Sequence, residues 1–181
     1  RELIRRTGAS FGWDTIARKI ELATHKTAAE YIELMEDSFI LKTLYQVDMN
    51  TGLPAARRMK KVYFLDSFIF WALRGWIESW PDCFDHARRA LAEPETKARL
   101  VEQVTAAALF HACDRPDWLN SRVYYWRNGG EIDFLVKSDE GLIPIEVKFQ
   151  TATGFDDFRP MARLGFKKGI LVSKDRLNNR D

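Results

Sequence analysis

Residues 121–150 alternate between apolar and polar side chains in three short runs, and two turn signals separate these runs. The signals are Asn128-Gly129-Gly130 and the stretch SDEG at residues 138–141, and both are typical of hairpin loops. A period of two residues fits strands rather than a helix, so this stretch predicts three adjacent antiparallel strands. In the second strand, one face is expected to carry Ile132, Phe134 and Val136, and the other Glu131, Asp133 and Leu135.

The third strand gives this sheet a candidate metal site. Its alternation places Glu146, Lys148 and Gln150 on one face, opposite Ile145, Val147 and Phe149. If Asp133 shares that face, two carboxylates and one lysine lie together, and carboxylate oxygens are the ligands that hard ions such as Mg²⁺ or Mn²⁺ prefer. The alternative is the solvated side of an ordinary sheet. We favour the metal site.

A helix is predicted to precede these strands. From Thr96 the chain is rich in Ala, and apolar residues recur at helical spacing: Leu100, Val101, Val104, Ala107, Ala108 and Phe110. Glu102 lies near the edge of this apolar stripe. It is either an exposed residue that supports the helix through a neighbouring turn or a member of the metal site, and the pattern leaves both open.

The first part of the chain predicts a winged helix over residues 1–75. Two short helices, with Asp14 and Thr24 as their N-caps, are followed by two β-rich runs at 38–47 and 60–65. Basic residues suited to a nucleic-acid backbone are Lys26, Arg57, Arg58, Lys60 and Lys61. Glu30 and Glu33 would face phosphates from the second helix, so a module that packs on or docks a protein partner is the slightly favoured alternative.

Composition and boundaries narrow the class of protein. Pro81 and Pro94 interrupt the periodicity, which predicts a helical linker at 76–95 and a second domain at 96–181. The net charge of +2 does not indicate a strong nonspecific polyanion binder. Two cysteines without metal spacing and the lack of an 18-residue apolar run favour a cytoplasmic protein with no membrane partner. A start without Met, within a helical stretch, leads us to expect part of a longer protein.

The expected order of helix, three strands, helix and strand resembles the PD-(D/E)XK nuclease superfamily. By that resemblance the fold class is α/β (α+β), with a restriction-endonuclease-like αβββαβ core after the winged helix-turn-helix. Asp133 matches the motif's Asp, and Glu146 and Lys148 match its (D/E)XK; Glu102 matches a helix-borne acid and Gln150 a further polar residue. The chain has EIDF where the motif's first half has PD. The implied metal ligands are Asp133, Glu146 and Glu102.

The whole chain also resembles the C-terminal region of a family of predicted prokaryotic AAA-type ATPases. The resemblance lies in LMEDSFILKTLY, KKVYFLDSF, LVEQV, VYYWR with GEIDFLV, IEVKFQ and GILVSKD. It implies an N-terminal ATPase domain as partner, although this sequence has no phosphate-binding loop and therefore no ATP site. The expected function is a Mg²⁺-dependent nuclease that acts on DNA. The alternative is a non-catalytic module that binds DNA or a protein for the ATPase.

Overall fold

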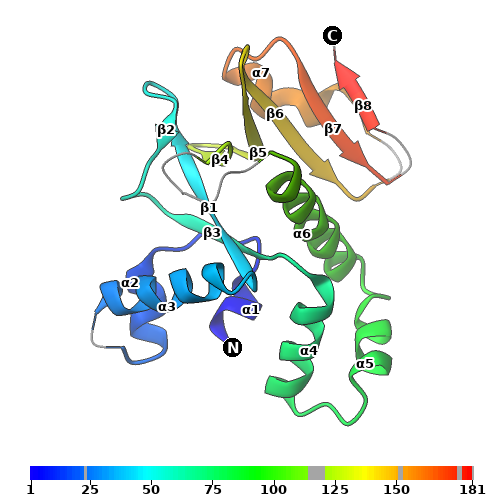
Figure 1. Ribbon diagram of the computed structural model, residues 1–181. Helices are drawn as coiled ribbons and strands as arrows, with labels where there is room; N and C mark the ends of the chain where they lie inside the picture. The colour runs from blue at the N-terminus through cyan, green and yellow to red at the C-terminus, as the bar shows by residue number, and fades with distance from the viewer. Residues whose placement is uncertain (23, 114–120, 151–152, 175–176, 181) are drawn as a thin grey trace. The chain divides into compact units, whose positions relative to one another are not determined.

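The computed structural model describes residues 1–22, 24–113, 121–150, 153–174 and 177–180. Two compact units make up the chain: unit 1 is Arg1–Leu44 with Arg57–Ala107, and unit 2 is Tyr45–Ala56 with Ala108–Asp181. Helices and a mixed sheet are both present, so the predicted α+β class is confirmed at this level (Figure 1). No described helix combines the length and the apolar content that a bilayer crossing needs.

Unit 1 begins with three helices, α1 (Glu2–Arg6), α2 (Trp13–Lys19) and α3 (His25–Asp37). The predicted cap of α3 is confirmed, because the Thr24 side chain accepts a hydrogen bond from the Thr27 backbone N–H at 3.1 Å. The predicted cap of α2 is wrong. Gly12 holds that position. Asp14 is the second residue of the helix, where its carboxylate still interacts favourably with the positive N-terminal end of the helix dipole.

Strands and further helices complete unit 1. The strands β1 (Leu41–Asp48), of which residues 41–44 belong to this unit, and β3 (Lys60–Phe64) pair, and α4 (Ser67–Glu78) and α5 (Cys83–Ala90) follow them. Asp66 caps α4 by accepting from the Phe68 N–H at 2.6 Å. The core of this unit is formed by buried side chains from α2, α3, the strands and α4, including Ile16, Ile32, Leu41, Val62, Phe64 and Phe70.

The unit boundaries differ from the predicted linker at 76–95. Helix α6 (Pro94–Cys113) begins at Pro94, where proline is tolerated because the first helical N–H needs no intrahelical acceptor. The change from unit 1 to unit 2 falls within this helix and within β1. Strand β1 pairs with β3 and also, in parallel, with β4 (Val123–Arg127). Tyr45–Ala56, which contains the end of the first predicted β-rich run and most of the loop after it, belongs to unit 2.

Unit 2 is built on a mixed sheet with the order β2-β1-β4-β5-β6-β7-β8. The three strands predicted at 121–150 are confirmed as β4, β5 (Glu131–Ser138) and β6 (Gly141–Lys148), each antiparallel to the next. A crossover through η2 (Phe155–Phe158) and α7 (Arg159–Arg163) leads to β7 (Gly169–Ser173), which is parallel to β6 (Figure 1). Short strands β2 (Leu53–Pro54) and β8 (Leu177–Arg180) complete the order.

A β-bulge in β5 interrupts the predicted alternation. Tyr124 pairs with Leu135 and Trp126 with Ile132, so two residues of β5, Asp133 and Phe134, lie opposite one residue of β4. As a result, Ile132 and Leu135 belong to the same buried cluster, together with Tyr124, Phe158, Met161 and Leu171. The prediction that Ile132 and Leu135 face opposite ways was therefore wrong, since one inserted residue reverses the side-chain phase.

Gly169 allows α7 to pack closely on the start of β7. A Cβ at this position would overlap Met161 Sδ and would lie 3.2 Å from Pro144 Cγ and 3.4 Å from the Pro144 carbonyl. We expect Gly169→Ala to lower the free energy of unfolding by about 1–2 kcal/mol through overpacking, softened by the flexibility of Met161. Urea unfolding of the wild type and the variant measures this loss of stability. Gly130→Ala is the control, because its Cβ would meet only Trp126 at 3.9 Å; equal losses would contradict this packing.

Candidate functional site

Asp133 lies at the bulge of β5, next to β6. The two strands pair with Phe134 opposite Ile145, so the next position in the same register places Asp133 opposite Glu146. Here the Asp133 carboxylate accepts a hydrogen bond from the Val147 backbone N–H, with Oδ2 and N 2.9 Å apart. This side-chain bond fixes the Asp133 carboxylate at the end of the hairpin, beside the backbone of the Glu146-Val147-Lys148 segment.

Glu146 and Lys148 form an ion pair on β6. Lys148 Nζ donates to Glu146 Oε1 at 2.8 Å, as two residues on the same face of a strand can do. Glu146 is 5% exposed, whereas the Lys148 side chain is 35% exposed. The carboxylate is thus covered by protein, while the ammonium group lies nearer to solvent.

The pKa of Lys148 reports the charges that surround it. Burial lowers this pKa, but the hydrogen bond from Lys148 to Glu146 and the negative charges of Glu146, Asp133 and Asp157 outweigh burial and raise it above 10.5. Lys148 is therefore an ammonium ion at neutral pH and cannot act as a proton acceptor there. Its role in any chemistry is that of a positive charge and a hydrogen-bond donor.

Asp157 is a member of this site that the sequence did not reveal. It lies on η2, in the crossover between β6 and β7, and its charge acts on Lys148. Its carboxylate accepts a hydrogen bond from the Gly154 N–H at 2.9 Å and contacts the Gln150 amide at 3.4 and 3.5 Å. The only local signal was the acidic pair in FDDF at 155–158, which is equally typical of the first turn of a helix.

Gln150 is exposed, and its amide is directed to Asp157 rather than to Glu146. The structure therefore brings together four of the expected and newly found side chains, Asp133, Glu146, Lys148 and Asp157, and attaches Gln150 to their edge through Asp157. All five belong to unit 2.

Glu102 belongs to unit 1, where it has partners of its own. Its Oε1 accepts a hydrogen bond from Tyr63 Oη at 2.6 Å and forms an ion pair with Lys61 Nζ at 3.2 Å. The Lys61 side chain is 2% exposed and that of Glu102 is 22% exposed. In this structure the Glu102 carboxylate thus neutralises a buried lysine.

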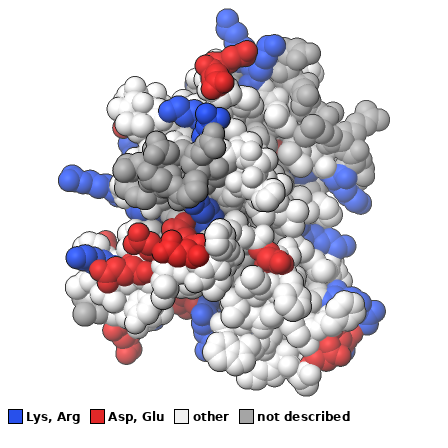
Figure 2. Space-filling view, viewed as in Figure 1, with Lys and Arg blue, Asp and Glu red and all other residues white. Residues whose placement is uncertain are grey.

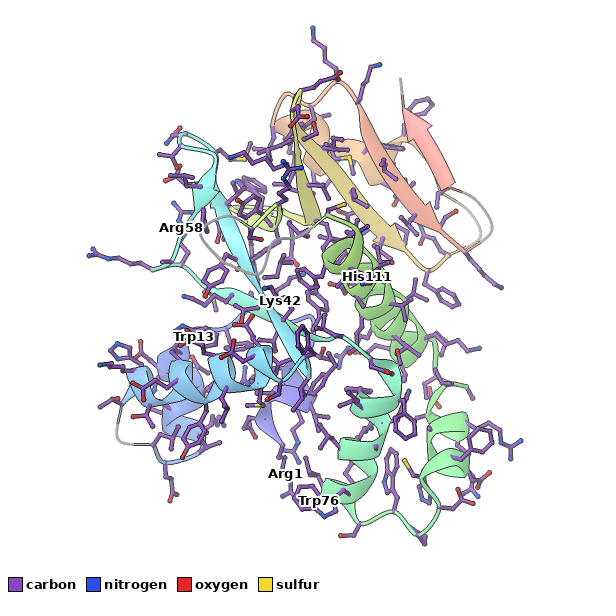
Figure 3. All side chains as sticks on the ribbon, viewed as in Figure 1. Arg1, Trp13, Lys42, Arg58, Trp76 and His111 are labelled. Atoms are coloured by element: carbon purple, nitrogen blue, oxygen red, sulfur yellow. The ribbon has the colours of Figure 1, made fainter. Side chains whose placement is uncertain are left out.

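The residues expected to contact nucleic acid divide into two groups. Lys26 on α3 and Arg57 and Arg58 before β3 are exposed, and Figure 3 labels Arg58 on that loop. Lys60 and Lys61 are buried, so their expected display on a wing is corrected. Lys60 Nζ donates to the Arg58 carbonyl at 2.8 Å and lies 5.2 Å from the centre of the Trp13 ring, and burial lowers its pKa. On the face that Figure 2 shows, acidic and basic side chains of the described residues are interspersed.

The donor set at the hairpin end fits part of the shell of a hard divalent ion. Among the residues that the structure describes, no group of three or more His, Cys, Asp or Glu side chains is arranged to hold a metal. Mg²⁺ is commonly bound by only one or two protein carboxylates, with water and substrate phosphate in its remaining positions. Asp133 and Glu146 carry carboxylate oxygens of the kind that such an ion prefers, so these residue types are compatible with it.

Comparison with known protein families gives two matches. Residues 97–180 are similar to a family described as a domain of unknown function (DUF4143), and residues 1–79 to another domain of unknown function (DUF8612). Each match covers less than half of the chain. The two matches leave residues 80–96 between them, whereas the compact units divide within β1 and α6. No curated protein and no solved structure matches the chain.

Proposed function

We propose that residues 96–181 form a metal-dependent phosphodiesterase domain that cleaves DNA, with Asp133, Glu146 and Lys148 at its centre. The observation that carries this proposal is that these three side chains lie together at the open end of the β5–β6 hairpin, away from its turn. The Asp133 carboxylate is held by the Val147 N–H, and Lys148 is held by the buried Glu146. The carboxylates on an ordinary solvated strand face are exposed, whereas Glu146 is only 5% exposed.

The order of elements supports the same proposal. Helix α6 is followed by β4, β5 and β6, by the η2–α7 crossover and by the parallel strand β7. An αβββαβ core would have its elements in this order along the chain, and the proposed site lies where β6 ends and the crossover begins. Side chains at such a position can face a bound substrate, because the following segment leaves the sheet there.

Each side chain can be given a role from its contacts. Lys148 is a protonated donor that offsets negative charge on the oxygens of a scissile phosphate. Glu146 orients Lys148 through the 2.8 Å bond, and Asp133 and Asp157 add further negative charge near the same ammonium group. The bond from Val147 to Asp133 Oδ2 fixes the orientation of the Asp133 carboxylate.

Asp133 and Glu146 would hold Mg²⁺ or Mn²⁺, which when bound polarises a phosphate and lowers the pKa of a coordinated water. Lys26, Arg57 and Arg58 are exposed and would contact the nucleic-acid backbone, with residues 1–75 as a winged-helix module. The resemblance to the C-terminal region of AAA-type ATPases supports a place beside an ATPase domain in a longer protein.

The proposal predicts a defined pattern of lost function. Asp133→Ala and Glu146→Ala should each abolish Mn²⁺ binding in calorimetric titration, because the proposed ion needs both carboxylates and each variant leaves only one. Lys148→Ala should keep the ion but reduce cleavage of DNA by about 100-fold or more, as expected for loss of a group that stabilises the transition state. Cleavage is measured on single- and double-stranded DNA and on RNA, with Mg²⁺ and with Mn²⁺.

Two exposed residues of the same hairpin provide matched controls. Asp139→Ala removes a carboxylate from the turn, and Lys137→Met removes an ammonium group from β5, without touching the site. Both variants should retain binding and cleavage. Circular dichroism shows whether each variant is folded. If the folded wild-type chain binds no Mn²⁺ at millimolar concentration, the nuclease proposal is wrong.

A second candidate function is a non-catalytic module that binds DNA or a protein for the ATPase. The contacts of Glu102 favour it, since the third expected carboxylate is engaged with Lys61 and Tyr63 in unit 1. Wild-type protein that binds DNA, loses that binding on Arg57→Ala with Arg58→Ala, and cleaves no substrate with either metal would support this candidate instead.

A further inference from the structure

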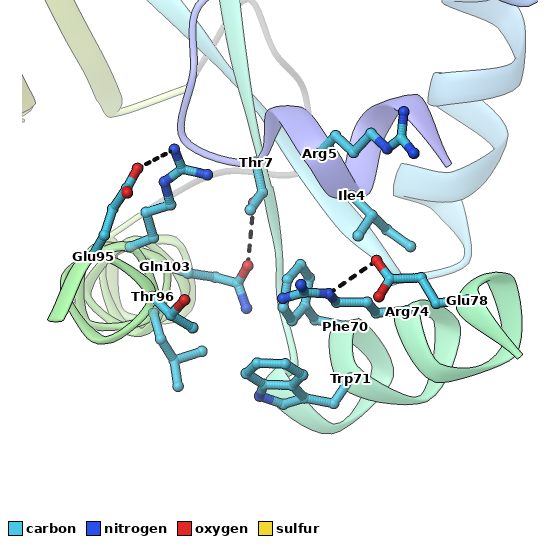
Figure 4. Close-up of a pocket in the computed structure, with 12 residues that line it drawn as sticks. Ile4, Arg5, Thr7, Phe70, Trp71, Arg74, Glu78, Glu95, Thr96 and Gln103 are labelled. Carbon is cyan, nitrogen blue, oxygen red and sulfur yellow. Dashed lines mark hydrogen bonds and ion pairs between the residues drawn. The ribbon is translucent and has the colours of Figure 1, made fainter. Parts of the chain in front are cut away.

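Unit 1 contains a cavity of about 260 Å³ whose lining comes from α1, the segment after it, α4 and α6 (Figure 4). All of its lining residues belong to this one unit. Apolar side chains form much of the wall, including Ile4, Phe70, Trp71 and Leu100. A space of this size suits a small molecule rather than a peptide or a polynucleotide.

Gln103 is the most deeply buried polar side chain in the wall. It is 2% exposed, and its Oε1 accepts a hydrogen bond from the Thr7 hydroxyl at 3.1 Å. Its Nε2 has no hydrogen-bond partner within the described part of the chain. Figure 4 shows this side chain extending from α6 toward Phe70. A buried amide N–H₂ without an acceptor is costly, so the cavity presents a donor that an acceptor on a ligand would satisfy.

Arg74 provides a second donor from the opposite wall. Its guanidinium lies over the rings of Trp71 and Trp80, 5.4 and 5.2 Å from their centres, and its Nε donates to Glu78 at 3.2 Å. These contacts hold the group in place, and its side chain extends from α4 toward the side of Gln103 in Figure 4. A planar guanidinium held in this way is suited to two-oxygen groups such as carboxylate and phosphate.

The charged residues at the cavity favour an anion. Three arginines, Arg5, Arg74 and Arg99, line it together with two glutamates, Glu78 and Glu95, so the lining carries one net positive charge. Glu95 pairs with Arg99 at 2.7 Å, and their side chains are 79% and 57% exposed, so both charges of this pair are largely screened by water. The buried end of the cavity offers donors and the aromatic wall offers apolar contact.

We propose that this cavity binds a small molecule through an oxyanion, either a carboxylate or a phosphate group. The oxyanion accepts hydrogen bonds from Gln103 Nε2 and from Arg74, and the remainder of the ligand packs against Phe70, Trp71 and Leu100. The site is separate from the hairpin of unit 2 and does not depend on the nuclease proposal.

Calorimetric titration and thermal unfolding of the full 181-residue chain test this proposal. The probes are sodium phosphate, sodium benzoate and benzamide, at constant ionic strength set with sodium chloride. Benzamide has the shape of benzoate without its charge. We expect benzoate or phosphate to bind at millimolar concentration and to raise the melting temperature, and benzamide to bind at least about tenfold more weakly. Binding of phosphate alone identifies the phosphate source, and binding of benzoate identifies a carboxylate with an apolar body.

Three variants assign the binding to the two donors. Gln103→Glu places a carboxylate at the donor position and should abolish binding of the anion that binds wild type. Gln103→Met and Arg74→Gln should each weaken binding by about tenfold or more, the factor expected from losing a charge-assisted hydrogen bond. Arg88→Gln, which breaks the exposed Arg88–Asp85 pair on α5, is the matched control and should bind as wild type does.

Either of two results overturns the proposal. One is a wild-type chain that binds neither anion at millimolar levels, or that binds benzamide as tightly as the anion it binds. The other is a folded Gln103→Met or Arg74→Gln variant with wild-type affinity, which would place any anion elsewhere. Circular dichroism establishes folding, and Gln103→Met preserves the size of the side chain in case Gln103→Glu does not fold.

Discussion

Replacing Glu102 with Ala is expected to lower the free energy of unfolding by about 2–4 kcal/mol. The change removes the carboxylate that faces Lys61, whose side chain is 2% exposed, and it also removes the acceptor of the 2.6 Å bond from Tyr63. A buried ammonium that loses its counter-charge retains its desolvation cost without the compensating attraction. The partial exposure of Glu102 keeps the expected loss below that of a fully enclosed pair. Urea unfolding monitored by fluorescence measures it.

Helix α6 supplies the control for this result. Glu95 also forms an ion pair with an arginine on the same helix, but the Glu95 and Arg99 side chains are 79% and 57% exposed. Glu95→Ala should therefore change the free energy of unfolding by less than about 0.5 kcal/mol. Adding Lys61→Met to Glu102→Ala should recover much of the loss, because the buried charge is then gone. Equal effects of Glu102→Ala and Glu95→Ala would contradict a structural role for Glu102.

Lys148→Met is expected to destabilise unit 2 by about 1.5–3 kcal/mol. The variant leaves Glu146, which is 5% exposed, without the ammonium group that now lies 2.8 Å from its Oε1. The expected loss is reduced because the Lys148 side chain is 35% exposed and water screens part of the attraction. A double-mutant cycle with Glu146→Leu isolates the pair, and the double variant should recover most of the stability.

The pH dependence of this effect follows from the raised pKa of Lys148. A lysine whose folded-state pKa exceeds its unfolded value of 10.5 contributes stability that is fully present below pH 10.5 and is lost as the pH rises through the folded value. The difference in stability between wild type and Lys148→Met should therefore stay constant through neutral pH and narrow only above pH 10.5. Lys137→Met, on the exposed side of β5, should show no such difference. A stability difference between wild type and Lys148→Met that narrows near neutral pH would contradict the raised pKa of Lys148.

The sequence determined the features of this protein that depend on neighbours along the chain. Asn128-Gly129-Gly130 and the SDEG turn, with alternating residues between them, were enough to predict β4, β5 and β6. A hairpin needs only local turn conformations and a period of two. Thr24 was identified as a cap because a cap bonds an N–H only two or three residues away. Glu146 and Lys148 were placed together because they are two residues apart on one strand.

Only the tertiary structure decided the features that depend on residues distant in sequence. Glu102 and Lys61 are 41 positions apart, and neither residue type indicates that a strand buried on both faces would enclose the lysine. The bulge at Asp133 depends on the pairing with β4, where a single residue lies opposite two residues of β5. Asp157 acts on Lys148 only because the crossover after β6 returns to the sheet. Strand β1 likewise pairs with both β3 and β4, and the alternation of residues along a strand does not specify which other strands it pairs with. Local patterns specify how a segment folds, whereas its partners are selected by packing among all the segments at once.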